Sequence, residues 1–285
     1  KRQYETNPYP RWVHVGMIEQ PKTITETIAE LNLNVRSNDT PKDDKISILI
    51  AGCGTGQHAI GSSSRYKNAS ITAVDLSLAS LAYAKRKTKE MLINNIDYLQ
   101  ADILNLTSLN QQFDIIESAG VLHHMKNPKQ GWKILTQCLN YGGLMRIGLY
   151  SNLAREHILK TRKELGTGEK HFDNLTMKKI RQDLILSEKE HHQRLSRSGD
   201  FYNTSSFRDL LFHAQEEMFT IPKIKKHLSE LGLIFCGMES VAVRQDFLTE
   251  YHQDDLYNLD KWHQFEVNHP RSFGEMYVFW CQKIG

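Results

Sequence analysis

The sequence predicts an α/β fold in which a doubly wound parallel sheet carries a helical insertion before its last two strands. Short apolar, β-branched runs alternate with helix-forming stretches between residues 46 and 150. The first run, 46–51, ends in glycines at 52, 54 and 56, which is typical of a buried strand that enters a tight turn and then a helix. The alternation stops after residue 150 and returns near residue 221.

The composition argues against several classes of protein. The 285 residues suffice for one large domain with an insertion or for two small domains. The net charge of +3 is too small to indicate nucleic acid or a membrane surface, and no apolar run approaches the ~18 residues of a transmembrane helix. Four widely spaced cysteines indicate free thiols in a reducing compartment. We therefore expect a cytoplasmic protein without a nucleic-acid or membrane partner.

Residues 1–45 precede the sheet as an arm, a helix and a linker. The segment 4–12 contains two prolines and three aromatic residues and is expected to be extended. A helix is expected at 24–33, and a polar linker at 34–45. The arm either packs on the fold or closes as a lid over a bound ligand.

The sheet is expected to begin within residues 46–150. The patterns predict strands at 46–51, 71–75, 96–100, 113–117 and 144–150, with helices at 57–65, 78–94 and 128–139 between them. Right-handed crossovers bring the carboxyl ends of parallel strands to one edge, and open α/β sheets bind their ligands at that edge.

The glycines at 52, 54 and 56 form the first part of a predicted ligand site. Because glycine lacks a Cβ and adopts positive φ, a ligand can lie directly on the backbone, where the following helix also points its free N–H groups. Asp75 closes the second strand 19 residues after Gly56 and can accept hydrogen bonds from both hydroxyls of a ribose. Asp102 follows the third strand and can accept one from an adenine amino group.

A dinucleotide site is the alternative interpretation of the same loop. The NAD fingerprint G-x-G-x-x-G requires its third glycine at position 57, where this chain has Gln57. An NAD-dependent oxidoreductase is therefore the less favoured interpretation.

The glycine loop, the ribose acid and the adenine acid, in this order, resemble the class I S-adenosylmethionine (SAM) dependent methyltransferases. The resemblance implies a Rossmann-like seven-stranded methyltransferase sheet, SAM as the cofactor and methyl transfer as the reaction. It assigns SAM binding to Gly52, Cys53, Gly54, Gly56, Gln57, Asp75, Leu76, Asp102, Ile103 and Ala119, with Tyr4 and Arg11 added by the N-terminal lid. The chain departs from the family at Ile50, where most members carry an acid.

Three stretches narrow the resemblance. Residues 3–12, 48–60 and 208–213 together look like a bacterial group of methyltransferase domains that are often joined to tetratricopeptide repeats. A ~34-residue repeat is not visible in this sequence, so the implied repeat region would lie upstream of residue 1. The substrates of that group are poorly defined, and the resemblance therefore names the methyl donor but not the acceptor.

Two neighbouring histidines follow the fourth strand. His123 and His124 are candidates for a base, but a similar Val-Leu-His-His run frames the cofactor in many of the resembling methyltransferases, which favours a structural role. No carboxylate or cysteine accompanies them at metal-ligand spacing, so we expect no metal. The residues expected to bind the acceptor are Tyr9, His123, Tyr202, Arg208 and Glu216.

Residues 151–220 are polar and helical, and this insertion is expected to build the acceptor side. A helix at 207–219 would place Asp209, His213 and Glu216 on one face at i, i+4 and i+7. We expect His213 to be the general base and Asp209 to orient it. The alternative is an ordinary surface helix with exposed ion pairs.

The chain divides into four parts in this interpretation. They are the N-terminal arm, helix and linker (1–45), the SAM-binding core (46–150), the helical insertion (151–220) and a C-terminal part that completes the core (221–285). The last part is expected to contain a helix at 221–231, strands at 233–243 and 276–282, and a long loop at 249–271 between them.

The expected function is methyl transfer from SAM to an unidentified acceptor. A protein side chain is favoured as the acceptor, and a small metabolite or a sugar is the alternative. A scaffold domain that keeps the fold without methylating anything is a further alternative from another class.

Overall fold

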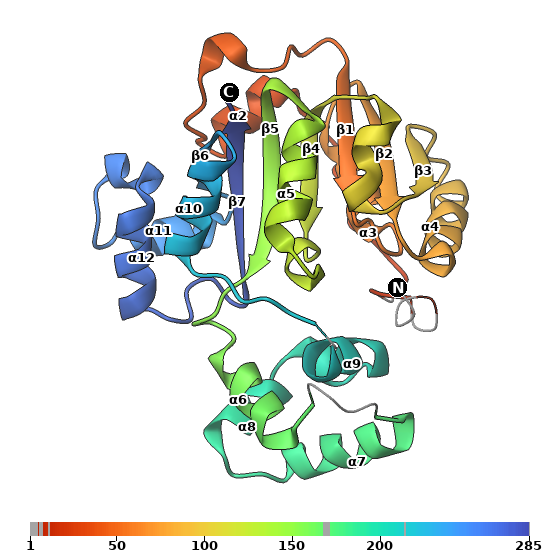
Figure 1. Cartoon of the computed structure of the whole chain (residues 1–285), viewed down its shortest axis with the longest axis vertical. Coiled ribbons are helices and arrows are strands. Elements are labelled where there is room, and N and C mark those ends of the chain that lie inside the picture. The colour runs from red at the N-terminus through yellow and green to blue at the C-terminus, as the bar shows by residue number, and fades with distance from the viewer. Residues whose placement is uncertain (1–4, 6–7, 11, 168–171, 214, 285) are drawn as a thin grey trace.

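The computed structural model describes residues 5, 8–10, 12–167, 172–213 and 215–284, and its centre is one seven-stranded sheet (Figure 1). The strands are β1 (Ile46–Ala51), β2 (Ala69–Asp75), β3 (Ile96–Gln100), β4 (Phe113–Ala119), β5 (Leu139–Tyr150), β6 (Leu233–Met238) and β7 (Met276–Lys283). Their order across the sheet is β3-β2-β1-β4-β5-β7-β6. Strands β1 to β5 pair in parallel, and β7 is antiparallel to both of its neighbours. The expected doubly wound seven-stranded sheet is confirmed.

Helices cover both faces of this sheet. On one face lie α2 (Ile24–Glu30), α3 (Gln57–Arg65) and α4 (Leu78–Glu90), and on the other lie α5 (Pro128–Gln137), α10 (Ile221–Glu230), α11 (Val241–Phe247) and α12 (Leu259–Asn268). Alternate side chains of β1 enter the two cores, since Ile48 and Ile50 face α3 while Leu49 and Ala51 face α5. None of the described helices has the length and apolar composition needed to cross a bilayer.

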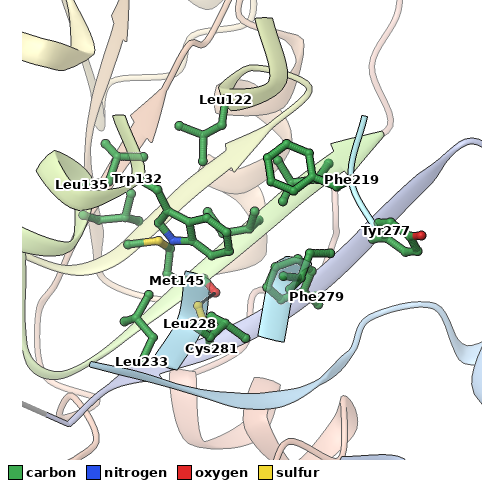
Figure 2. Packing of buried hydrophobic residues seen from close by; sticks show 14 of the residues in the cluster. Leu122, Trp132, Leu135, Met145, Phe219, Leu228, Leu233, Tyr277, Phe279 and Cys281 are labelled. Carbon is green, nitrogen blue, oxygen red and sulfur yellow. Dashed lines mark hydrogen bonds between the residues drawn. The ribbon is translucent and has the colours of Figure 1, made fainter. Parts of the chain in front are cut away.

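Trp132 of α5 is the centre of the larger core. Its side chain is fully buried and packs among Leu122, Met145 and Phe279, as Figure 2 shows. The ring centroids of Trp132 and Phe279 lie 6.0 Å apart. This core fixes α5 against β5 and β7, and it thereby fixes the loop that follows β4.

Four helices of the insertion form a separate layer beneath the carboxyl edge of the parallel strands (Figure 1). They are α6 (Glu156–Leu165), α7 (Asn174–Ile185), α8 (Glu190–Ser196) and α9 (Thr204–Phe212). Their apolar side chains have a small core of their own, which includes Ile158, Met177 and Phe207. The four-part division of the chain stays a prediction.

Three expectations about secondary structure are wrong. The strand expected at 233–243 ends at Met238, because Ser240 caps α11 by accepting a hydrogen bond from Val243 N. The loop expected at 249–271 contains α12, whose buried Trp262 and Phe265 follow a helical spacing that the prediction overlooked. Strand β5 begins at Leu139 and not at residue 144, after a shift in its register with β4.

The helix expected at 207–219 is also wrong. Helix α9 ends at Phe212, and His213 has extended backbone angles (φ −64°, ψ 129°). Residues 215–219 return to the sheet edge, where Glu217 N donates to His123 O (2.8 Å) and Phe219 N donates to Tyr150 O (2.9 Å). These bonds to the sheet replace the helical bonds, so Asp209, His213 and Glu216 do not share a helix face.

Replacing Trp132 with alanine should lower the free energy of unfolding by about 3–5 kcal/mol, since a fully buried indole is lost from a packed core. Urea unfolding followed by circular dichroism measures this. Leu175→Ala is the control, because Leu175 is 77% exposed and its loss should change stability by no more than about 0.5 kcal/mol. Equal losses in the two variants would contradict this description of the core.

Candidate functional site

The glycine loop between β1 and α3 has the backbone that the sequence predicts. Gly52, Gly54 and Gly56 have φ values of +83°, +52° and +86°. A Cβ at these positions would lie 2.4 Å from Val121, 2.6 Å from the Tyr9 carbonyl oxygen and 2.6 Å from Ala84, respectively. The glycines therefore leave room for neighbouring protein atoms as well as for a ligand, and no other residue fits this loop without strain.

Asp75 lies at the end of β2 and holds the glycine loop. Its Oδ2 accepts from Gly54 N (2.8 Å) and its Oδ1 accepts from Ser77 N (2.8 Å). Burial raises the pKa of Asp75, while these two backbone bonds lower it. The next residue, Leu76, is 39% exposed at the rim. Asp75 thus joins the glycine loop to the start of α4 at the ligand-binding edge.

The ends of β1, β3 and β4 complete this edge. Asp102 is half-buried and caps the short helix η2 (Ile103–Leu109), because its Oδ1 accepts from Leu104 N (2.9 Å). Ile103 is buried behind it, and Ala119 is the half-buried last residue of β4. At the end of β1, Cys53 is buried and Gln57 begins α3.

The N-terminal segment lies directly on the glycine loop. Thr55 N donates to Tyr9 O (3.3 Å), Thr55 Oγ1 donates to Pro10 O (2.6 Å), and Trp12 Nε1 donates to Thr55 Oγ1 (3.1 Å). Glu5 accepts from the first N–H groups of α4, at Leu78 and Ala79. Tyr4 and Arg11, which are predicted to bind the donor, lie outside the described residues.

Three histidines and a tyrosine meet where the insertion reaches the sheet. The ring centroids of His124 and His213 lie 3.9 Å apart, and those of His123 and Tyr150 lie 3.7 Å apart. Burial lowers the pKa of His213 to about 4 and that of His124 to about 3, so both rings are neutral at pH 7. The buried ring nitrogens of His123 have no hydrogen-bond partner among the described residues.

Charged residues surround these rings. Glu216 forms an ion pair with Arg162 and lies 3.7 Å from Arg155, and burial raises its pKa to about 7. The guanidinium of Arg155 lies 3.6 Å from the ring centroid of Tyr150 and also binds Glu275 (2.6 Å). Arg155 of the insertion therefore contacts both Tyr150, at the end of β5, and Glu275, directly before β7.

Tyr9 lies near both the glycine loop and the acids of the insertion. Its carbonyl lies on the glycine loop, as described above, while its phenol interacts electrostatically with Asp200, Asp209 and Glu275. Burial and these three carboxylates raise the pKa of Tyr9, and Arg155 opposes them. Tyr9 thus contacts the glycine loop and lies in the electrostatic field of two acids of the insertion, Asp200 and Asp209, and of Glu275 before β7.

The fold does not bring every predicted acceptor residue to this place. Arg208 donates to Phe172 O (3.2 Å) and Asn174 Oδ1 (3.0 Å), both within the insertion. Tyr202 is 61% exposed, and its hydroxyl donates to Ser196 O (2.8 Å). The observed bonds of these two residues are therefore internal to the insertion.

Sequence reasoning missed Tyr150, Arg155, Arg162 and Glu275. Tyr150 ends β5, and its place at a strand end was a signal that could have found it. Arg155 and Arg162 carry no such signal, because a basic residue in a polar helical stretch is usually predicted to be exposed to solvent.

Two groups of side chains bring possible metal ligands together, although the sequence spacing gave no sign of them. They are His124, His213 and Glu216, and, on the insertion, Glu164, His191 and His192. In the first group Glu216 is already paired with Arg162, and His213 Nδ1 accepts from Gln215 N (3.2 Å). In the second, Glu164 is bound by Lys189 (2.9 Å). Existing partners therefore compete with a cation at both places.

The comparison with protein families agrees with this geometry. Residues 48–143 match a family model described as a methyltransferase domain. The chain therefore contains a class I SAM-dependent methyltransferase domain, and SAM is its cofactor. The positive-φ glycines and the two carboxylates at the ends of β2 and β3 fit the shape and the hydroxyl and amino groups of SAM.

Several proteins share parts of this sequence. The chain is 27% identical to an uncharacterized protein of Synechococcus sp. over 240 residues, which cover 80% of this chain and 57% of that protein. Malonyl-[acyl-carrier protein] O-methyltransferase of Paenibacillus sp. is 32% identical over 38% of this chain and 40% of its own length. (S)-coclaurine N-methyltransferase of Papaver somniferum is 30% identical over 36% of this chain and 29% of its own length.

Among solved structures, PKMT2 from Rickettsia typhi matches 90% of this chain and 51% of its own, with a TM-score of 0.68 and 16% identity. At this identity the likeness shows the fold alone. The chain thus spans about half the length of the two proteins that it matches over most of its own residues.

Replacing Asp75 with alanine should weaken SAM binding by roughly 1.5–3 kcal/mol, because a charged acceptor is lost from both the ligand and Gly54 N. Titration calorimetry measures this, with NAD as a ligand that should not bind. Asp97→Ala, at an exposed acid on β3, is the matched control and should bind SAM like the wild type. Unchanged affinity in Asp75→Ala would show that SAM binding depends neither on a bond to Asp75 nor on its hold on the glycine loop.

Proposed function

We propose that this chain transfers the methyl group of SAM to an amine of a protein side chain. The observation that carries the proposal is the position of Tyr9, whose backbone lies on the glycine loop while its phenol lies within the field of three carboxylates. An acceptor held beside Tyr9 would be next to the donor and next to those acids. The N-terminal segment would then serve as the lid over the donor.

The charged residues near Tyr9 favour an amine as the methyl acceptor. Among the described residues of this region, the acids Asp200, Asp209, Glu216 and Glu275 lie near the cations Arg155, Arg162 and Arg194. The acids outnumber the cations, so a cationic acceptor would be attracted here and an anionic one repelled. The two relatives above that are named as methyltransferases have different acceptors in their names and align over 38% and 36% of this chain, so the local charges are the better guide.

Bound SAM supplies a sulfonium whose methyl group is already electrophilic. The residues of the chain must hold the acceptor in line with it, which can contribute up to ~7–11 kcal/mol, and must take a proton from the amine. His213 is the proposed proton acceptor with Asp209 as its orienting partner, because burial keeps His213 neutral. The groups proposed to bind the acceptor are Glu216, His123 and Tyr9. Tyr202 and Arg208 are proposed to contact the acceptor from the outer part of the insertion.

His123 is a second candidate for the proton acceptor. Its ring nitrogens are buried and have no hydrogen-bond partner among the described residues, whereas Nδ1 of His213 accepts from Gln215 N. His123 also follows β4 at the edge where the donor binds.

The compartment and the partners are also part of the proposal. All four cysteines are free and buried, which supports a reducing, cytoplasmic location. A tetratricopeptide-repeat region in the same polypeptide would be the proposed partner module, and it would present the acceptor protein.

Incubation with methyl-labelled SAM in extract of the source cells tests the acceptor class. We expect label in protein, and acid hydrolysis should release it as an N-methyl amino acid. Label confined to small molecules would favour the metabolite or sugar alternative. SAM binding without any labelled product would favour the scaffold alternative.

Replacing His213 with alanine should lower the turnover of the true acceptor about 10²-fold or more and leave SAM affinity nearly unchanged. Because burial lowers the pKa of His213 to about 4, protonation of its ring should not produce an acid limb of kcat near pH 6.5 in the wild type. His123→Ala is measured beside it. Full turnover in His213→Ala, with the loss found in His123→Ala, would move the proton-acceptor role to His123.

A further inference from the structure

Glu117 of β4 is a fully buried carboxylate next to the glycine loop. In the parallel pairing of β1 with β4 it stands beside Ile50, two residues before Gly52. The resemblance to SAM-dependent methyltransferases implies an acid at the position of Ile50. A negative charge that is missing from β1 is therefore present on the neighbouring strand, on the face that packs against α3.

The contacts of Glu117 converge on α3. Its Oε2 lies 2.5 Å from His58 Nε2 and accepts from Ser62 Oγ (2.8 Å), while its Oε1 accepts from the hydroxyl of Tyr66 (2.9 Å). His58 and Ser62 belong to α3, and Tyr66 is the residue that ends it. One carboxylate thus holds the helix at its first turn, its middle and its end.

Neighbouring basic side chains stabilise the negative charge of Glu117. Burial alone would raise its pKa, but His58, Arg146 and Arg65 lower it well below the usual range. Arg146 of β5 is itself bound by two oxygens of Glu239 (2.5 and 2.6 Å), which also accepts from Trp280 Nε1 (3.0 Å). Arg146 Nη1 also lies 3.3 Å from His58 Nε2, so Glu117 contacts α3 directly, whereas Glu239 is linked to it only through Arg146.

We propose that Glu117 is a positioning residue for SAM, which acts through His58 to fix the first turn of α3 and the glycine loop that leads into it. Helix α3 begins directly after Gly56, so a displacement of His58 would move the N–H groups that face the donor. The inference rests on SAM binding at this loop.

Glu117→Gln and Glu239→Gln form a matched pair for the test. Each removes one carboxylate from the same network and keeps the shape of the side chain, but only Glu117 contacts α3 directly, since Glu239 reaches it through Arg146. We expect Glu117→Gln to raise the dissociation constant for SAM roughly tenfold, because the charged partner of His58 is lost. Glu239→Gln should raise it by less than about threefold. Titration calorimetry well below the melting temperature of each variant measures both.

Two further readouts separate positioning from general stability. Hydrogen exchange at residues 57–62 should quicken in Glu117→Gln more than in Glu239→Gln when the melting temperatures of the two variants have fallen equally. With saturating SAM, kcat should stay near that of the wild type while KM for SAM rises. If Glu117→Gln does not fold, His58→Gln replaces it, because His58 is partly exposed and its loss should weaken SAM binding in the same direction.

Equal losses of SAM affinity in Glu117→Gln and Glu239→Gln would overturn the proposal, and so would an unchanged affinity in Glu117→Gln. Wild-type protein is titrated first. A wild type that does not bind SAM contradicts the cofactor assignment itself, which is a different result from a variant that binds no worse than its control.

Discussion

The parallel pairing of β1 with β2 and β4 is the constraint on which the whole site depends. Because parallel strands share a direction, their carboxyl ends meet at one edge of the sheet, and Gly52, Asp75 and Ala119 meet there although they are far apart in sequence. The N-terminal segment and the insertion both lie at this edge. The donor site is therefore formed by the edge of the sheet, and the proposed acceptor site by the N-terminal segment and the insertion.

The donor side could be predicted from the sequence because its signals are local. A β-branched run followed by glycines, or by an aspartate, marks the end of a buried strand wherever the strand lies in the sheet. The structure agrees with this prediction, since Gly52, Gly54 and Gly56 have positive φ values and Asp75 is the last residue of β2. What local signals did not show is that protein atoms, including the Tyr9 carbonyl, also fill the space left by the glycines.

The acceptor side could not be predicted in the same way because long-range contacts decide it. The sequence 213–219 has a helical pattern, but Glu217 N donates to His123 O and Phe219 N donates to Tyr150 O in place of helical bonds, and Glu216 forms a buried ion pair with Arg162. The partner of Glu117 is likewise set by the fold, since His58 lies on another element 59 residues away. Such pairs exist only after the sheet has formed.

A crystal structure with S-adenosylhomocysteine bound tests the central claim most directly. If methyl transfer occurs between the glycine loop and the insertion, the sulfur of the product will face Tyr9 and His123. The contrary result is a sulfur that faces the cavity of about 600 Å³ between α5 and α10, which Lys126, Lys129 and Lys223 line. The acceptor would then enter from the far side of α5, and the acids around Tyr9 would have no part in the reaction.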